Sequence, residues 1–142
     1  MRYALFTAEW ARAWGDALRA NEDYRRAASS WRWPLVLTMS AAPESGLPEE
    51  RAVYLDLFQG DCREARAATA ADLAAVPYVI AADPSTWKRV LERELEPLTG
   101  LMRGKLRLAK GSVASLIPYL SAAKEMVLSA TRIETLFPEA LV

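Results

Sequence analysis

The stretch that decides the fold, residues 83–111, reads DPSTWKRVLERELEPLTGLMRGKLRLAKG. Asp83 offers a carboxylate to the free amides of a helix start, and Pro84 suits the first helical position, where its missing N–H costs nothing. The sequence therefore predicts a helix that begins at Pro84. Pro97 opens a second short helix, and Gly104 can end it because glycine adopts a positive φ at little cost.

Apolar residues give this stretch one buried face. They recur at helical spacing, which predicts packing on an apolar partner. The residues concerned are Trp87, Val90, Leu91, Leu95 and Leu98. Beyond the glycine, residues 105–108 alternate basic and apolar side chains, which favours a strand with one buried face.

This stretch resembles the sterol carrier protein 2 (SCP-2) type lipid-binding family. The positions that carry the resemblance are Leu95 and Pro97, then Met102, Gly104, Lys105 and Leu106, and then Gly111. Two positions depart from the family pattern: Arg93 stands where a glycine is usual, and Ser112 stands where an acidic or amide residue is common. The resemblance implies an α+β fold, in which helices cover a five-stranded, mainly antiparallel sheet and a hydrophobic tunnel lies between the two.

The composition fits one domain and disfavours several kinds of chemistry. The chain has 142 residues, enough to bury its own core, so we expect a single SCP-2-like domain over residues 1–142. Its 18 basic and 18 acidic residues balance, which disfavours nucleic-acid binding. Histidine, the commonest metal ligand and general base, is absent, and Cys62 is the one cysteine. We therefore expect no metal site, no cofactor and no disulfide.

The same composition bears on the compartment. The N-terminal residues turn charged at Glu9, Arg12 and Asp16, so they lack the apolar run of a signal peptide. Charged residues interrupt every long apolar stretch, so none is expected to span a bilayer. Together with the lone cysteine, these features predict a cytoplasmic protein.

The rest of the chain predicts the remaining elements. One long helix is expected over residues 6–24, with Thr7 as its N-cap and Gly15 at a close approach to a neighbouring element. Residues 69–75 fit either a helix or a loop, and Pro118 either kinks the last helix or starts a new one. Strands are expected over residues 35–40, 51–58, 62–67 and 77–82, the first three as an antiparallel meander.

What the resemblance implies is a tunnel that holds a fatty acid, an acyl-CoA ester, a phospholipid or a sterol-like lipid. Leucine and methionine suit such a lining because they repack around different shapes, although the same residues fit ordinary core packing. The candidate ligand-binding residues are Trp87, Leu91, Leu95, Leu98, Leu101, Met102, Leu106, Leu116 and Leu120. Trp10 and Trp14 on the first helix are assigned to the closed core instead.

Basic residues near the expected tunnel are candidates for a lipid headgroup. Arg103 and Lys105, with Arg107 beyond them, could bind a carboxylate or a phosphate at the mouth of the tunnel. The alternative is that these three side chains form a solvated strand face beside Glu94 and Glu96.

We therefore expect a lipid-binding and lipid-transfer protein that is not an enzyme and that holds its ligand without altering it. The one cluster that suggests catalysis, Glu92, Glu94 and Glu96, fits a solvated helix end. The competing hypothesis is an accessory domain that supports a lipid or quinone pathway through protein contacts, made by residues 133–137 or residues 31–33. Transient membrane contact and a homodimer also remain open.

Overall fold

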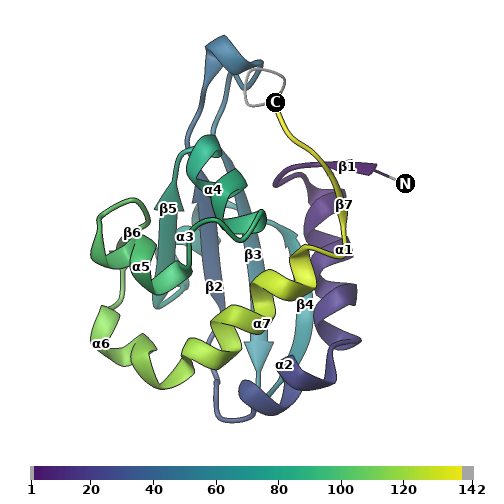
Figure 1. Ribbon diagram of the computed structural model, residues 1–142, viewed down its shortest axis with the longest axis vertical. Coiled ribbons are helices and arrows are strands. Elements are labelled where there is room, and N and C mark those ends of the chain that lie inside the picture. Colours follow the sequence, from purple (N-terminus) through teal and green to yellow (C-terminus); the bar gives the residue numbers. More distant parts are fainter. Residues whose placement is uncertain (1, 139–142) are drawn as a thin grey trace.

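The computed structural model describes residues 2–138 and is built around a five-stranded mixed sheet (Figure 1). The strands are β2 (Leu35–Met39), β3 (Arg51–Phe58), β4 (Asp61–Ala67), β5 (Tyr78–Ala82) and β6 (Arg107–Lys110). They lie in the order β4-β3-β2-β5-β6. The pairs β2–β3, β3–β4 and β5–β6 are antiparallel, and β2–β5 is parallel. The expected α+β fold is confirmed; residues 1 and 139–142 of the expected domain lie outside the described residues.

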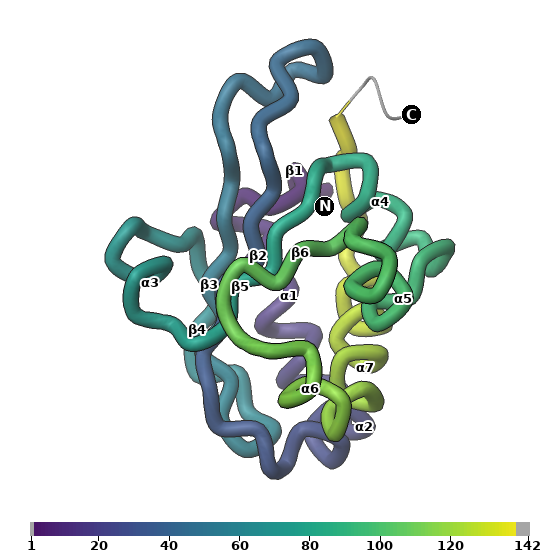
Figure 2. The backbone as a smooth tube through the Cα atoms, turned by 90° about the vertical axis from the view of Figure 1, so that its left-hand side faces the viewer, coloured from purple at the N-terminus to yellow at the C-terminus, as the bar shows by residue number. Residues whose placement is uncertain are grey.

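Helices cover the two faces of the sheet unequally. Figure 2 shows α4, α5 and α7 on one side of the sheet and α3 on the other. The helices are α1 (Ala8–Arg19), α2 (Glu22–Ala27), α3 (Ala70–Ala75), α4 (Pro84–Leu91), α5 (Pro97–Met102), α6 (Val113–Leu116) and α7 (Leu120–Ala130), with the 3₁₀ turns η1 (Pro43–Ser45) and η2 (Ile117–Tyr119). Residues 69–75, which fitted either a helix or a loop, therefore form a capped helix.

The main core lies on the inner face of the sheet because apolar residues alternate along β3. Val53, Leu55 and Leu57 are buried there, whereas the residues between them face the other side. Strand β2 is buried along its whole length, since it lies at the centre of the sheet with both faces covered. A smaller apolar cluster around Val36 and Val79 packs beside α3 on the outer face.

Side-chain caps fix the helix starts that the sequence predicts. Thr7 Oγ1 accepts a hydrogen bond from the Trp10 amide at 3.3 Å, and Asp83 Oδ1 accepts one from the Thr86 amide at 2.7 Å. Helices α1 and α4 therefore begin one residue after these caps. Gly104 has a φ of 73° directly after α5, as expected for a residue that ends a helix.

The long first helix is a wrong prediction, because Asn21 divides it into α1 and α2. The Asn21 side chain accepts a hydrogen bond from the Tyr24 amide at 3.1 Å, which caps a new helix. Its amide nitrogen also donates to Ser129 Oγ on α7 at 2.9 Å. The chain turns here because the buried Asn21 side chain caps the start of α2 and also hydrogen-bonds to α7.

Two further differences concern strands. The strand expected over residues 105–108 begins at Arg107, because the amides of Lys105 and Leu106 still donate to the Gly100 carbonyl, at 2.8 and 3.0 Å. A short parallel pair, β1 (Arg2–Ala4) with β7 (Glu134–Leu136), was not predicted. Three residues of alternating character give too little pattern to separate a strand from a loop.

Two local predictions about helix packing and helix breaks are confirmed. A Cβ added at Gly15 would lie 2.7 Å from the Cβ of Ala65 on β4, so α1 does approach the sheet closely there. Pro118 lies in η2, between α6 and α7, and thus separates two helices instead of bending one. The break at Pro118 matters for the site, because it separates the short α6 from α7.

Candidate functional site

The inner face of the sheet and the helices above it enclose an apolar cavity of about 130 Å³. Its sheet side is lined by Leu35, Leu37, Leu57 and Ile80. Its helix side is lined by residues of α1, α2, α4, α5, α6 and α7. Large aromatic side chains make up a good part of the lining: Trp14, Tyr24, Trp31, Trp87 and Tyr119.

The polar atoms of the three lining tryptophans are already satisfied by the protein. Each indole N–H donates to a backbone carbonyl, so the rings offer hydrocarbon to the cavity and no free donor. The three bonds are Trp14 Nε1 to the Met126 carbonyl (3.0 Å), Trp31 Nε1 to the Trp33 carbonyl (2.6 Å) and Trp87 Nε1 to the Thr38 carbonyl (2.9 Å). At these three indoles a polar ligand would find no replacement for its hydrogen bonds to water.

The lining also lacks groups for acid–base chemistry. Within residues 2–138 no carboxylate, lysine or arginine side chain lines the cavity. Burial raises the pKa of Tyr24 well above its usual range, so this hydroxyl stays neutral. A neutral wall of this kind suits the binding of hydrocarbon rather than proton transfer.

Six of the nine predicted ligand-binding residues line the cavity: Trp87, Leu98, Leu101, Leu106, Leu116 and Leu120. They come from α4, α5, the loop before β6, α6 and α7, and the fold brings them together.

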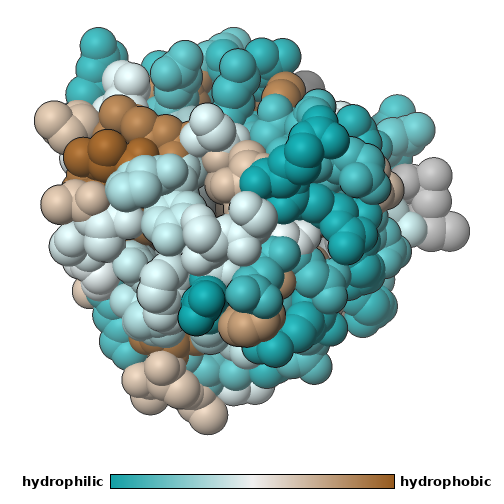
Figure 3. Space-filling view, turned by 90° about the horizontal axis from the view of Figure 1, so that it is seen from below, coloured by the Kyte–Doolittle hydropathy of each residue, from teal (hydrophilic) through white to brown (hydrophobic). Residues whose placement is uncertain are grey.

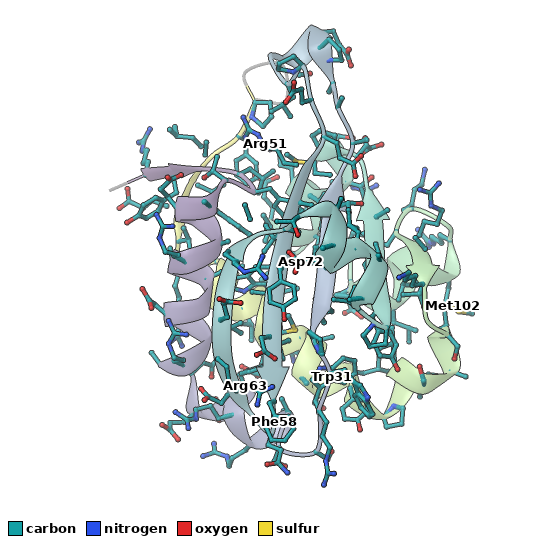
Figure 4. The ribbon with its side chains drawn as sticks, turned by 180° about the vertical axis from the view of Figure 1, so that it is seen from behind. Trp31, Arg51, Phe58, Arg63, Asp72 and Met102 are labelled. Atoms are coloured by element: carbon teal, nitrogen blue, oxygen red, sulfur yellow. The ribbon has the colours of Figure 1, made fainter. Side chains whose placement is uncertain are left out.

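Leu91, Leu95 and Met102 are not part of this lining. Helix α4 ends at Leu91, so the helical spacing that placed Leu95 on the same face does not continue. Leu95 is instead buried against Gly100, whose added Cβ would lie 3.4 Å from Leu95 Cδ2. Met102 is the last residue of α5, and its side chain is 73% exposed. Figure 4 shows it at an outer edge of the molecule, apart from Trp31.

Sequence reasoning missed most of the aromatic lining. Trp14 was assigned to closed core, and the structure places it on the cavity wall, while Trp10 is fully buried and outside the lining. Trp31 and Tyr119 were not singled out at all as lining residues. The available signal was the Trp31-Arg32-Trp33 sequence before β2. Two large aromatic residues in a short connection indicate that at least one of them packs against another part of the chain.

An aromatic cluster surrounds Trp31 in the cavity wall. The Trp31 ring lies 4.8 Å from the Tyr119 ring, 5.1 Å from the Tyr78 ring and 5.2 Å from the Trp33 ring, measured between centroids. The Tyr78 hydroxyl and Ser115 Oγ are 2.9 Å apart and hydrogen-bonded. This bond and the ring contacts hold α6 and η2 against the sheet.

The lining residues on α5, α6 and η2 are partly exposed, as are most of those on α7 and Ile80 on β5, whereas those on α1, α2 and α4 are buried. We call the part of the lining formed by α5 and by the α6–η2–α7 corner the mouth and define it by Leu98, Leu101, Leu116, Tyr119 and Leu120. The short α6 and the 3₁₀ turn after it form one side of the mouth.

The charged candidates lie outside the cavity. Arg103, Lys105 and Arg107 are exposed; Arg103 is the C-cap residue of α5, and Lys105 follows two residues later. Glu92, Glu94 and Glu96 are exposed as well, and Glu92 forms an ion pair with Lys88 at 2.9 Å. The glutamates therefore do not converge on the cavity.

The segments considered for protein contacts are partly used within the chain. In residues 133–137, β7 pairs with β1, and Ile133 and Phe137 pack against the main core. In residues 31–33, Trp31 is 5% exposed and Trp33 is 38% exposed. Trp33 and, in the first segment, Leu136 at 47% exposed therefore offer the sizeable apolar surface of these two segments.

A second hollow of about 570 Å³ lies at the other end of the molecule. It is an open groove between the β2–β3 connection and the β1–β7 pair, with Glu44 and Arg51 in its lining. Arg51 Nη1 donates a hydrogen bond to the Leu5 carbonyl at 2.9 Å, so this guanidinium is already bonded within the protein. The smaller apolar cavity is the better candidate because it is more enclosed and uniformly apolar.

Two other kinds of site can be assessed for the described part of the chain. No three of its acidic or cysteine side chains are grouped so that they could hold a metal ion. None of its helices has the length and apolar character needed to cross a membrane.

Comparisons with known proteins identify relatives among solved structures. A crystal structure of sterol carrier protein 2 is 46% identical, with a TM-score of 0.83, over 91% of this chain and 98% of that one. A solution structure from Thermus thermophilus, described as possibly a sterol carrier protein, is 45% identical, with a TM-score of 0.82, over 92% of this chain and 90% of that one.

A more distant neighbour shares the fold alone. Sterol carrier protein 2 from Yarrowia lipolytica, in its apo form, is 13% identical, with a TM-score of 0.55, over 82% of this chain and 88% of that one. No protein-family model and no curated protein sequence matches the chain.

Proposed function

This chain belongs to the sterol carrier protein 2 family, and from that premise we propose that it binds a lipid in its apolar cavity and carries it without altering it. The ligand classes are those with a long hydrocarbon part: a fatty acid, an acyl-CoA ester, a phospholipid or a sterol-like lipid. We propose that residues 1–142 act as one lipid-binding domain of this kind.

The observation that carries the proposal is the largely apolar lining, in which the three indole N–H groups are already hydrogen-bonded. Three indole N–H groups that could have bound a polar ligand are occupied by backbone carbonyls. The remaining walls are mainly leucine and alanine side chains, together with Val90, Met126 and Val127. Such a surface discriminates by shape and apolar area, which suits an alkyl chain.

The energetics favour a hydrocarbon ligand. Each methylene moved from water into an apolar site contributes roughly 0.8 kcal/mol, so a sixteen-carbon chain offers on the order of 12 kcal/mol before the cost of immobilisation. No catalytic group is needed for this binding. The described lining has no carboxylate, lysine or arginine side chain, and Tyr24 stays neutral, which supports a carrier that is not an enzyme.

The cavity must widen when it is filled. Its volume of about 130 Å³ is near that of an engineered cavity of ~150 Å³ that binds benzene, and below the ~300–1,000 Å³ of typical ligand sites. The mouth is the part that can yield, since Leu116, Tyr119 and Leu120 are partly exposed and α6 has four residues. We therefore propose that α6, η2 and the start of α7 move outward as the ligand enters, which breaks the Tyr78–Ser115 hydrogen bond and separates the Trp31 and Tyr119 rings.

Other features of the carrier follow from the same proposal. Arg103 and Lys105 beside the mouth would bind a ligand carboxylate or phosphate, since basic side chains pair well with such groups. The carrier would act in the cytoplasm and visit membranes briefly to exchange its ligand. A homodimer is the competing use of its exposed apolar residues.

The test is ligand uptake by a matched pair of variants. Leu120→Arg places a charge on the cavity wall, whereas Ser121→Arg places the same charge on the exposed neighbouring residue of α7. We expect wild type and Ser121→Arg to take up a fluorescent fatty acid and to carry lipid in native mass spectra, and Leu120→Arg to lose uptake by at least roughly tenfold. Circular dichroism checks that both variants fold. Equal uptake by the two variants would contradict a ligand site in this cavity.

A further inference from the structure

One hydrogen-bonding side chain in the cavity wall lacks a partner. The lining side chains that carry an N–H or O–H group are Trp14, Tyr24, Trp31, Trp87 and Tyr119. The three indoles donate to backbone carbonyls, and the Tyr119 hydroxyl donates to the Ser30 carbonyl at 3.5 Å, in an exposed position. The Tyr24 hydroxyl is the exception, since within residues 2–138 only the backbone of Tyr24 takes part in hydrogen bonds.

The unpartnered oxygen of Tyr24 borders open space. Among the described residues, every fully enclosed side-chain nitrogen or oxygen has a hydrogen-bond partner. The Tyr24 hydroxyl has none, so its oxygen is not fully enclosed. Tyr24 is nevertheless only 1% exposed, and it belongs to the cavity wall. We therefore assign the space beside the hydroxyl to the cavity.

Helix α2, which carries Tyr24, is held firmly against the rest of the molecule. Its N-cap residue Asn21 is 4% exposed and bonds to Ser129 on α7 at 2.9 Å. The helix lies at the lower end of Figure 1, and Figure 3 views that end from below. Most of the surface there is hydrophilic or intermediate, and an apolar patch lies toward the side of α6. A ligand group therefore reaches the buried hydroxyl through the cavity and not through this surface.

The chemistry of this hydroxyl selects an uncharged partner. Burial raises the pKa of Tyr24, with smaller contributions from Cys62 and Asp61, so the hydroxyl keeps its proton and can donate it in a hydrogen bond. A carboxylate or phosphate beside it would be a buried charge in a wall without lysine or arginine, which is costly. The group that fits is therefore a neutral oxygen, either a hydroxyl or a ketone.

We propose that the Tyr24 hydroxyl is the polar contact inside the cavity, and that the preferred ligand is a lipid whose buried hydrocarbon carries a hydroxyl or ketone oxygen. This inference rests on the proposed function and narrows its ligand class. A plain alkyl chain leaves the Tyr24 hydroxyl unpaired, whereas a neutral oxygen at the matching depth forms a hydrogen bond with it. The ionic end of such a lipid stays at the mouth, since the described lining has no lysine or arginine to pair with it.

The experiment measures how well unlabelled lipids displace a fluorescent fatty acid from the full chain. The lipids are hexadecanoic acid and its analogues with a hydroxyl on the second carbon, at mid-chain or on the terminal carbon. The affinity of each analogue is divided by that of hexadecanoic acid. For the mid-chain or the terminal analogue, this ratio should be at least roughly fivefold higher in wild type than in Tyr24→Phe, because the variant leaves the ligand hydroxyl buried and unpaired. Tyr54→Phe, the same change on the other face of β3, is the matched control and should keep the wild-type ratios.

The position of the ligand hydroxyl supplies a second readout. The second-carbon analogue should show the same ratio in wild type and Tyr24→Phe, since its hydroxyl stays at the mouth beside the carboxylate. Equal ratios in the two proteins at every position, or an equal loss in Tyr54→Phe, would overturn the proposal. If circular dichroism shows that Tyr24→Phe does not fold, wild type alone decides: a ratio that is no higher at mid-chain or at the chain end than at the second carbon overturns the proposal. Failure of hexadecanoic acid itself to displace the fluorescent probe would instead overturn the proposed function, on which this inference rests.

Discussion

The indole N–H of Trp87 on α4 donates to the backbone carbonyl of Thr38 on β2 at 2.9 Å, and both residues are buried. This bond ties the helix that opens the decisive sequence stretch to the central strand of the sheet. The Trp87 ring lines the cavity and also packs against the Phe6 ring, with 5.2 Å between the two ring centroids. One side chain therefore acts in the fold and in the site.

Trp87→Phe should lower the free energy of unfolding by about 1–3 kcal/mol, because it removes a buried hydrogen bond and leaves unfilled volume. Urea unfolding followed by circular dichroism measures this change. Trp33→Phe is the control, since Trp33 is 38% exposed, and it should cost less than about 1 kcal/mol. Equal losses would mean that the bond to Thr38 contributes nothing measurable.

Arg93 adopts a left-handed conformation, with a φ of 63°, directly after α4. This is the position at which the sequence departs from the family's usual glycine. The backbone conformation is that of a glycine, so the arginine is strained there. Arg93→Gly should therefore raise the free energy of unfolding by about 0.5–1 kcal/mol.

The matched control for this prediction is Arg89→Gly, the same substitution inside α4 at another exposed arginine. It should lower the free energy of unfolding by about 1 kcal/mol, since glycine weakens a helix interior. The two changes have opposite expected signs in one thermal or urea unfolding assay. A destabilising Arg93→Gly would show that the arginine side chain makes a contact that outweighs the strain.

The Arg66–Asp72 pair predicts how stability depends on pH. Arg66 donates two hydrogen bonds to the Asp72 carboxylate, at 2.6 and 2.9 Å, and so holds the pKa of Asp72 well below its usual range. The carboxylate is therefore harder to protonate in the folded chain than in the unfolded one. Its contribution is complete above the unfolded pKa of about 3.9 and is lost as the pH falls from there toward the depressed folded value.

Thermal unfolding at a series of pH values measures this effect. The melting temperature of wild type should fall more steeply below about pH 4 than that of Asp72→Asn, which cannot titrate at this position. Asp23→Asn, at an exposed aspartate on α2, serves as the control and should retain the wild-type slope. Parallel curves for wild type and Asp72→Asn would contradict the role given to the pair.

The sequence predicted best those features that depend on neighbouring residues. Caps at Thr7 and Asp83, the turn at Gly104 and the helix break at Pro118 each follow from local geometry, and the structure confirms all four. The predicted antiparallel meander is confirmed as β2, β3 and β4, whereas the parallel pairing of β2 with β5 was not predicted, because it joins residues far apart in the chain. Asn21 illustrates this: its cap is local, but its bond to Ser129 spans 108 residues.

The cavity was only partly predictable for the same reason. A buried leucine that lines a cavity and one that fills a core have the same sequence pattern, as Leu106 and Leu95 show. Met102 was a candidate because methionine suits an adaptable lining, but α5 ends there and the side chain is exposed to solvent. The aromatic wall was missed because Trp31 and Tyr119 meet only in the folded chain, with ring centroids 4.8 Å apart.

The most direct test of the central claim is a crystal structure of the protein with a bound long-chain fatty acid. The account predicts hydrocarbon density between Trp87, Trp31 and Leu120, with α6 and η2 displaced outward and the cavity enlarged to at least ~300 Å³. An interior that is unchanged, with the acyl chain in the open groove beside Arg51 or absent altogether, would contradict it.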